Sequence, residues 1–130
     1  MLALSASVVV ALGIYLARPW GGNHAYQDAT GYLVLGGLLL FSVSPYAGLA
    51  ALSRRFARAP VGHAVFVVGA GCIGMVGTLV YCDVAFVHPD AQGGLAFLSV
   101  PLVQWVATLL LLVIRAVIVR LAQPAAGDRG

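Results

Sequence analysis

Four long apolar runs, separated by short polar stretches, organise this chain. The runs cover approximately residues 2–20, 32–52, 62–86 and 95–121, with polar stretches at 21–31, 53–61 and 87–94 and a tail at 122–130. A helix needs about 20 apolar residues to cross a bilayer. Lipid offers no hydrogen bonds to the backbone, so each run is expected to be helical. The pattern predicts an all-α integral membrane protein, a single domain of four transmembrane helices in a small bundle.

The third run contains a glycine pattern with two interpretations. Gly69, Gly71 and Gly74 have the G-x-G-x-x-G spacing of a nucleotide-binding turn. That turn belongs to a strand–helix–strand unit, whereas no charged residue lies between Ala64 and Cys82. We therefore favour helix packing, because Gly71, Gly74 and Gly77 recur every three residues and give a smooth face that a neighbouring helix can approach.

A second pattern of small residues lies on the first run. Ala3, Ser7 and Ala11 recur every four residues and form another stripe suited to helix packing. This run lacks the basic segment that precedes the apolar core of a cleaved signal peptide. We expect it to be retained as the first helix, with Trp20 at the membrane interface.

Prolines interrupt two of the runs. Pro45 lies inside the second run and leaves the carbonyl of Phe41 without its helical donor, so a kink is expected. Ser42 and Ser44 are close enough to satisfy the loosened backbone. We favour a static bend over a gating hinge at Pro45. The fourth run is longer than a bilayer requires, so it either tilts or begins late, near Pro101.

Composition excludes a soluble protein. The chain of 130 residues is 62% hydrophobic and 8% charged, whereas soluble domains contain about 25% charged residues. The formal net charge is +3, but there is no Lys, and the arginines lie mainly at the ends of the apolar runs. The expected partner is therefore the lipid bilayer and not nucleic acid.

The arginines predict an orientation. Four crossings place the stretch 53–61 and both termini on one side of the membrane. That side carries Arg54, Arg55, Arg58, Arg115, Arg120 and Arg129, and the other carries Arg18 with Asp28, Asp83 and Asp90. Because basic residues accumulate in cytoplasmic loops, we expect both termini in the cytoplasm of a multi-pass cell-membrane protein, with a bacterial inner membrane as the expected location.

Side chains that suit a metal ion gather on the side predicted to face outward, in its two loops and at the end of the third run. They are His24, Asp28, Asp83, His88 and Asp90. Imidazole and carboxylate groups are ligands of divalent cations. Their spacing matches no established ligand motif, and polar residues beside Pro and Gly are ordinary in turns. We favour the turn interpretation and expect neither a metal nor a cofactor.

The two cysteines are not expected to pair with each other, and Cys82 could at most link two copies of the chain. Cys72 and Cys82 lie ten residues apart on one predicted helix, which separates them by about 15 Å. A disulfide needs Cα atoms within about 7 Å. We expect Cys72 to be a small, buried apolar residue and Cys82 to lie near a membrane surface.

The fourth run carries two polar side chains within the predicted membrane region. Gln104 and Thr108 lie four residues apart, on one helix face. A buried amide in hydrocarbon needs a partner on another helix, and we favour that contact over the lining of a solute path. No acidic residue occupies the middle of a run, which argues against a proton-coupled pump. The chain resembles small multidrug-resistance transporters in size and number of spans, but these keep a glutamate in the first helix and this sequence has no Glu.

The sequence contains no catalytic motif, so we do not expect an enzyme. The leading hypothesis is an accessory role, in which the small-residue faces pack against another copy of the chain or against a larger membrane complex. An oligomeric small transporter or channel is the first alternative. A metal-binding or enzymatic site on the outer face is the second.

Overall fold

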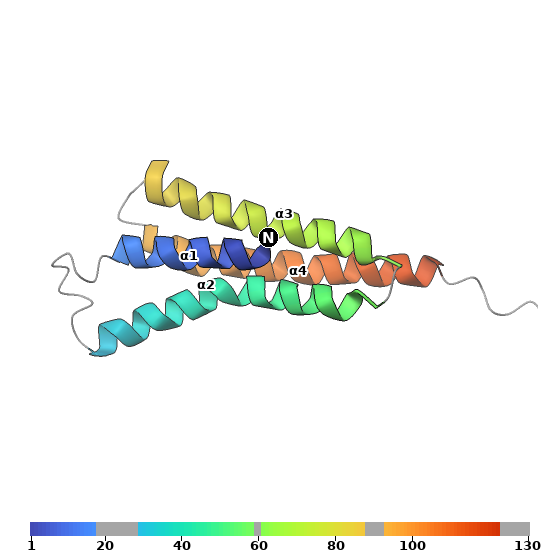
Figure 1. The fold of residues 1–130 in the computed structure, drawn as a ribbon, viewed down its shortest axis with the longest axis horizontal. Helices are drawn as coiled ribbons and strands as arrows, with labels where there is room; N and C mark the ends of the chain where they lie inside the picture. The colour runs from blue at the N-terminus through green and yellow to red at the C-terminus, as the bar shows by residue number, and fades with distance from the viewer. Residues whose placement is uncertain (18–28, 59–60, 88–92, 123–130) are drawn as a thin grey trace, which may run out of the picture.

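Four helices form an elongated bundle (Figure 1). The computed structural model describes residues 1–17, 29–58, 61–87 and 93–122. Their helices are α1 (Leu2–Ala17), α2 (Ala29–Phe56), α3 (His63–Cys82), which continues as the π-helical turn η2 (Asp83–Val87), and α4 (Gly93–Ala122). Successive helices alternate in direction, and α1 and α4 each pack against both α2 and α3. The prediction of an all-helical fold is confirmed for the residues described.

Within the described ranges, three helices are long and apolar enough to cross a membrane: residues Ala29–Phe56, His63–Val87 and Leu95–Ala122. The 16-residue α1 has a length of about 24 Å, shorter than a hydrocarbon core of about 30 Å. Its N-terminal end lies near the middle of the bundle (Figure 1). One half of the bundle therefore contains four helices, and the other half contains only α2, α3 and α4.

Two helix boundaries differ from those expected from the sequence. Helix α2 continues to Phe56 and includes Arg54 and Arg55 in its last turn, where positive side chains complement the helix dipole. Helix α4 begins at Gly93 and contains Pro101 in its interior. The alternative of a late start near Pro101 is therefore wrong.

Pro45 of α2 and Pro101 of α4 are buried. Each leaves a backbone carbonyl without its helical donor, and a serine hydroxyl donates to that carbonyl instead. Pro45 frees the carbonyl of Phe41, which accepts a hydrogen bond from Ser44 Oγ at 2.8 Å. Helix α2 bends in its middle part (Figure 1). The local satisfaction of this site by a neighbouring serine agrees with the sequence-based expectation.

In α4, the carbonyl that lacks its helical donor accepts a hydrogen bond from a residue of a different helix. Pro101 frees the carbonyl of Phe97, and Ser42 Oγ on α2 donates to that oxygen at 3.2 Å. A second contact joins the same helices, because Trp105 Nε1 donates to Ser44 Oγ at 3.1 Å. Ser42 and Ser44, which lie close to Pro45 in α2, thus join α2 to α4 through hydrogen bonds.

The buried apolar side chains form two clusters along the bundle. The first, where all four helices meet, contains Val9, Leu12, Tyr46, Tyr81, Ala85 and Phe97. The second lies among α2, α3 and α4 and contains Leu49, Phe66, Ala70 and Leu111. Leu2, at the start of α1, packs against both. Many other large apolar side chains are exposed, including Leu33, Val68 and Leu109, and exposed apolar surface of this extent is typical of contact with a membrane or with another protein.

Basic side chains gather at one end of the bundle. Arg54 and Arg55 lie in the last turn of α2 and Arg120 in the last turn of α4, and these two helices end on the same side (Figure 1). Asp83 begins η2 at the opposite end. We call the first of these the arginine end.

Candidate functional site

A layer of polar side chains crosses the middle of the bundle. This central polar layer consists of Ser42 and Tyr46 of α2, Thr78 of α3, and Gln104 and Thr108 of α4. All except Thr78 are fully or almost fully buried. Burying a polar group is costly unless it is hydrogen-bonded, so each of these side chains requires a partner.

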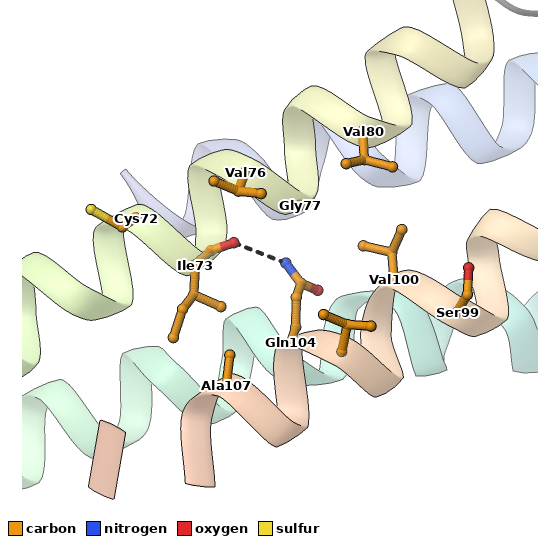
Figure 2. Close-up of a pocket in the computed structure, with 10 residues that line it drawn as sticks. Cys72, Ile73, Val76, Gly77, Val80, Ser99, Val100, Gln104 and Ala107 are labelled. Carbon is orange, nitrogen blue, oxygen red and sulfur yellow. Dashed lines mark hydrogen bonds between the residues drawn. The ribbon is translucent and has the colours of Figure 1, made fainter. Parts of the chain in front are cut away.

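Gln104 makes the contact between α3 and α4 that a buried amide needs. Its Nε2 donates to the backbone carbonyl of Ile73 at 3.3 Å (Figure 2). Gly77 permits this approach, because a Cβ atom at that position would collide with the Gln104 amide. The other amide atom, Oε1, is buried and has no hydrogen-bond partner among the residues described.

Hydroxyl groups complete the layer on both sides of Gln104. The Tyr46 and Thr78 hydroxyls lie 3.3 Å apart, and Thr78 Oγ1 also donates to the carbonyl of Gly74 at 2.9 Å. Thr108 Oγ1 donates to the carbonyl of Gln104 at 2.7 Å. Thr108 therefore bonds within its own helix, while Gln104 and Tyr46 link α4 and α2 to α3.

The predicted glycine face of α3 is only partly used inside the bundle. Gly74 and Gly77 are buried, and a Cβ atom on Gly74 would lie 2.8 Å from Leu2 Cδ2. Gly71 does not face a neighbouring helix closely, because a Cβ atom there would meet nothing within 4 Å. Two glycines thus contact neighbouring helices, and the third leaves a gap on the outer surface.

The small-residue stripe of α1 also faces outward. Ala3, Ser7 and Ala11 are exposed, and Ser7 Oγ donates back to the carbonyl of Ala3 at 3.0 Å. Helix α1 contacts its neighbours through the buried Val9 and Leu12 instead. The stripe therefore takes no part in packing among the four helices.

Other close approaches involve glycines that the sequence pattern did not single out for packing. A Cβ atom on Gly13 would meet Phe97 Cε1 at 3.0 Å, and one on Gly48 would meet Trp105 Cη2 at 2.7 Å. In both pairs a glycine faces a large aromatic ring on another helix. Such a glycine is recognised only when the aromatic residue that it faces is known, and a single sequence does not show which residues of different helices face each other.

An apolar groove lies between α3 and α4 on the outer side of the bundle. Its volume is ≈ 430 Å³, and the residues that line it include Cys72, Val76 and Val80 of α3 and Val100, Val103 and Ala107 of α4. Gln104 and Gly77 lie at its base (Figure 2). Cys72 is exposed, so the expectation that it is buried is wrong. Both cysteines are free, so they do not pair with each other, as predicted.

Aromatic and cationic side chains pack against one another at the arginine end. The guanidinium carbon of Arg115 lies 3.7 Å from the ring centroid of Phe56, and the Phe56 and Phe66 rings meet edge to face at 5.0 Å between centroids. Gly62 has a φ of 73°, and a Cβ atom at this position would lie 3.2 Å from Arg115 Cγ. These contacts join α2, α3 and α4, while Arg54, Arg55, Arg58 and Arg120 remain exposed.

The candidate metal ligands stay a prediction. Asp83 is exposed at the start of η2, and His24, Asp28, His88 and Asp90 lie outside the described residues. Within the described ranges, no three His, Cys, Asp or Glu side chains form a group that would hold a metal ion.

Comparison with known proteins adds no family. No protein-family model matches the chain, and no significant similarity links it to a curated protein or to a solved structure. The arguments below therefore rest on the residues and their geometry.

Proposed function

We propose that this chain is a small multi-pass membrane protein with an accessory role, packing against another copy of itself or against a larger membrane complex. The observation that carries the proposal is the exposed stripe Ala3, Ser7 and Ala11 on α1. Apolar surface alone does not drive helices together in lipid, and small residues favour association because they let backbones approach closely. The stripe offers such a surface on the outside of the bundle.

The test is purification of the native assembly in mild detergent, with its mass and subunit content measured together. We expect the wild-type chain to be recovered with a stoichiometric partner or as a defined homo-oligomer. Ala11→Leu places a large side chain on the stripe and should release the partner. Ala116→Leu is the matched control, because Ala116 is also exposed but lies on α4 near the arginine end. A wild-type monomer, or an assembly that survives Ala11→Leu, would contradict the proposal.

The proposal includes the arrangement in the membrane. All four helices insert into a bacterial inner membrane, and the arginine end and both termini face the cytoplasm, in keeping with the positive-inside tendency. Single cysteines on a background with Cys72→Ala and Cys82→Ala test this orientation. In intact cells, an impermeant maleimide should label Val87→Cys and leave Ala57→Cys unlabelled, since these exposed residues lie at opposite ends. The reverse labelling pattern would show the opposite orientation.

An oligomeric transporter or channel is the second candidate. It is supported by two features, the buried amide oxygen of Gln104, which has no hydrogen-bond partner among the described residues, and the proline at position 45 inside α2. In proteoliposomes this function would give solute or ion flux that Gln104→Leu reduces and that Leu109→Ala, at an exposed position on the same helix, leaves unchanged. Absence of flux across a panel of ions and small solutes would remove this candidate.

A further inference from the structure

The groove between α3 and α4 has the dimensions and lining of a small-molecule site. Its ≈ 430 Å³ falls within the range of about 300–1,000 Å³ that is usual for ligand pockets. Val76, Val80, Val100 and Val103 line it, and no charged residue does. Val76 and Val103 are exposed, so the groove opens toward the surrounding lipid.

The base of the groove contains an unused hydrogen-bond acceptor. Gln104 is only 3% exposed, and its Oε1 has no partner in the described parts of the chain. The orientation of the amide follows from Ile73, because reversing the amide would set two acceptor oxygens against each other. The oxygen must therefore point away from the Ile73 carbonyl, and Figure 2 shows it on the side of Val100.

A buried acceptor without a donor is costly, and a bilayer core contains almost no water to supply one. Leaving such a group unpaired costs about 1–3 kcal/mol, and most buried polar side chains in folded proteins have a partner. A donor must then arrive dissolved in the lipid. The apolar lining restricts that donor to the end of an otherwise apolar molecule.

We propose that the α3–α4 groove binds a linear apolar molecule with one hydroxyl group, which donates a hydrogen bond to Gln104 Oε1. The hydrocarbon chain lies along the valines, and the hydroxyl enters at the base of the groove beside Gly77. Oε1 is buried, so a small shift of the lining side chains accompanies binding. An ester or an ether of the same length would fit the groove but would supply no donor.

Cys72 provides a local readout, because its side chain lines the same groove and is exposed. The full chain is purified in mild detergent on a Cys82→Ser background, and alkylation of Cys72 by N-ethylmaleimide is followed by intact mass. Hexadecan-1-ol is the probe, and hexadecyl methyl ether is the probe without a donor. We expect the alcohol to protect Cys72 at about 10-fold lower concentration than the ether, the difference that a single hydrogen bond of about 1.4 kcal/mol produces.

Two variants separate the hydroxyl contact from the groove. Gln104→Leu should remove the preference for the alcohol and leave weak protection by both probes. Val103→Phe fills the groove from a position that is 67% exposed and should abolish protection by both. Val106→Phe is the matched control, because Val106 is 57% exposed on the same helix and does not line the groove. The valine pair keeps the test decisive if Gln104→Leu fails to fold.

Equal protection by the alcohol and the ether in the wild type would overturn the proposal, as would equal losses in Val103→Phe and Val106→Phe. Protection that rises with protein concentration in the absence of probe would also overturn it, since a helix of a second copy would then fill the groove. The source of the ligand is identified by mass spectrometry of co-purified lipids. A hydroxyl-bearing lipid that is retained by the wild type and lost in Val103→Phe indicates a membrane lipid, whereas binding of added alcohol alone indicates an external compound.

Discussion

Gly77→Ala tests how closely α3 and α4 approach at the central polar layer. The added Cβ atom would overlap the amide of Gln104 and lie 3.0 Å from the Tyr46 hydroxyl oxygen. Gln104 would have to withdraw from α3, and its 3.3 Å hydrogen bond to the Ile73 carbonyl would break. The contact between Tyr46 and Thr78 would be disturbed at the same time.

The expected cost follows from two destabilising contributions and one stabilising contribution. Overpacking of a close-packed interface costs about 1–3 kcal/mol, and an interhelical side-chain hydrogen bond in a membrane protein contributes about 0.6 kcal/mol on average. Alanine is favoured over glycine within a helix by about 0.8–1.0 kcal/mol. The net expectation is a loss of about 0.6–2.8 kcal/mol in the free energy of unfolding.

The assay is reversible unfolding in mixed micelles with increasing SDS, followed by far-ultraviolet circular dichroism. Gly71→Ala is the matched control, because a Cβ atom there meets nothing within 4 Å, and it should be neutral or stabilising by up to about 1 kcal/mol. The double variant Gly77→Ala/Gln104→Ala makes room for the methyl group. It should be destabilised by less than the sum of its single variants, as expected for residues in direct contact. If Gly77→Ala and Gly71→Ala were equally stable, the close approach of α3 and α4 would be refuted.

Two further variants test contacts elsewhere in the bundle. Ser44→Ala removes both the acceptor of Trp105 Nε1 and the donor to the Phe41 carbonyl. We expect a loss of about 1–3 kcal/mol in the free energy of unfolding and a shift in Trp105 fluorescence, measured on a Trp20→Phe background. Unchanged emission would contradict the Trp105 contact. Phe56→Leu keeps an apolar side chain but removes the ring beneath Arg115; we expect a loss of about 0.5–2 kcal/mol in the same SDS titration, and a wild-type midpoint would show that the ring contributes nothing.

Structural features that involve a single helix could be predicted from the sequence. The bend at Pro45 and its satisfaction by Ser44 involve residues within a single turn, so the missing backbone bond identifies both the defect and its remedy. The four apolar runs likewise follow from the length that each helix needs, and the structure describes helices in all four. Gln104 was recognised because an amide is rare among apolar residues, and the requirement for a partner on another helix follows from burial alone.

Features that depend on the rotation of a helix were not accessible. In a soluble helix, polar residues mark the exposed face, whereas a membrane helix is apolar both toward lipid and toward its neighbours. The sequence therefore did not show that Cys72 faces outward, or that Gly71 is open while Gly77 is covered. Pro101 was ambiguous for a related reason, because the donor to its freed carbonyl, Ser42, comes from α2.

The serine contacts between α2 and α4 have a consequence for assembly of the bundle. In the membrane arrangement proposed above, two helices that meet side by side can slide along each other, and apolar surfaces in lipid give little preference for one axial position. A displacement by one helical turn, about 5.4 Å, would separate Ser42 from the Phe97 carbonyl and Trp105 from Ser44. The carbonyl freed by Pro101 would then lie unpaired in hydrocarbon, which costs several kcal/mol. A proline that weakens α4 in isolation therefore selects a single alignment of α4 against α2.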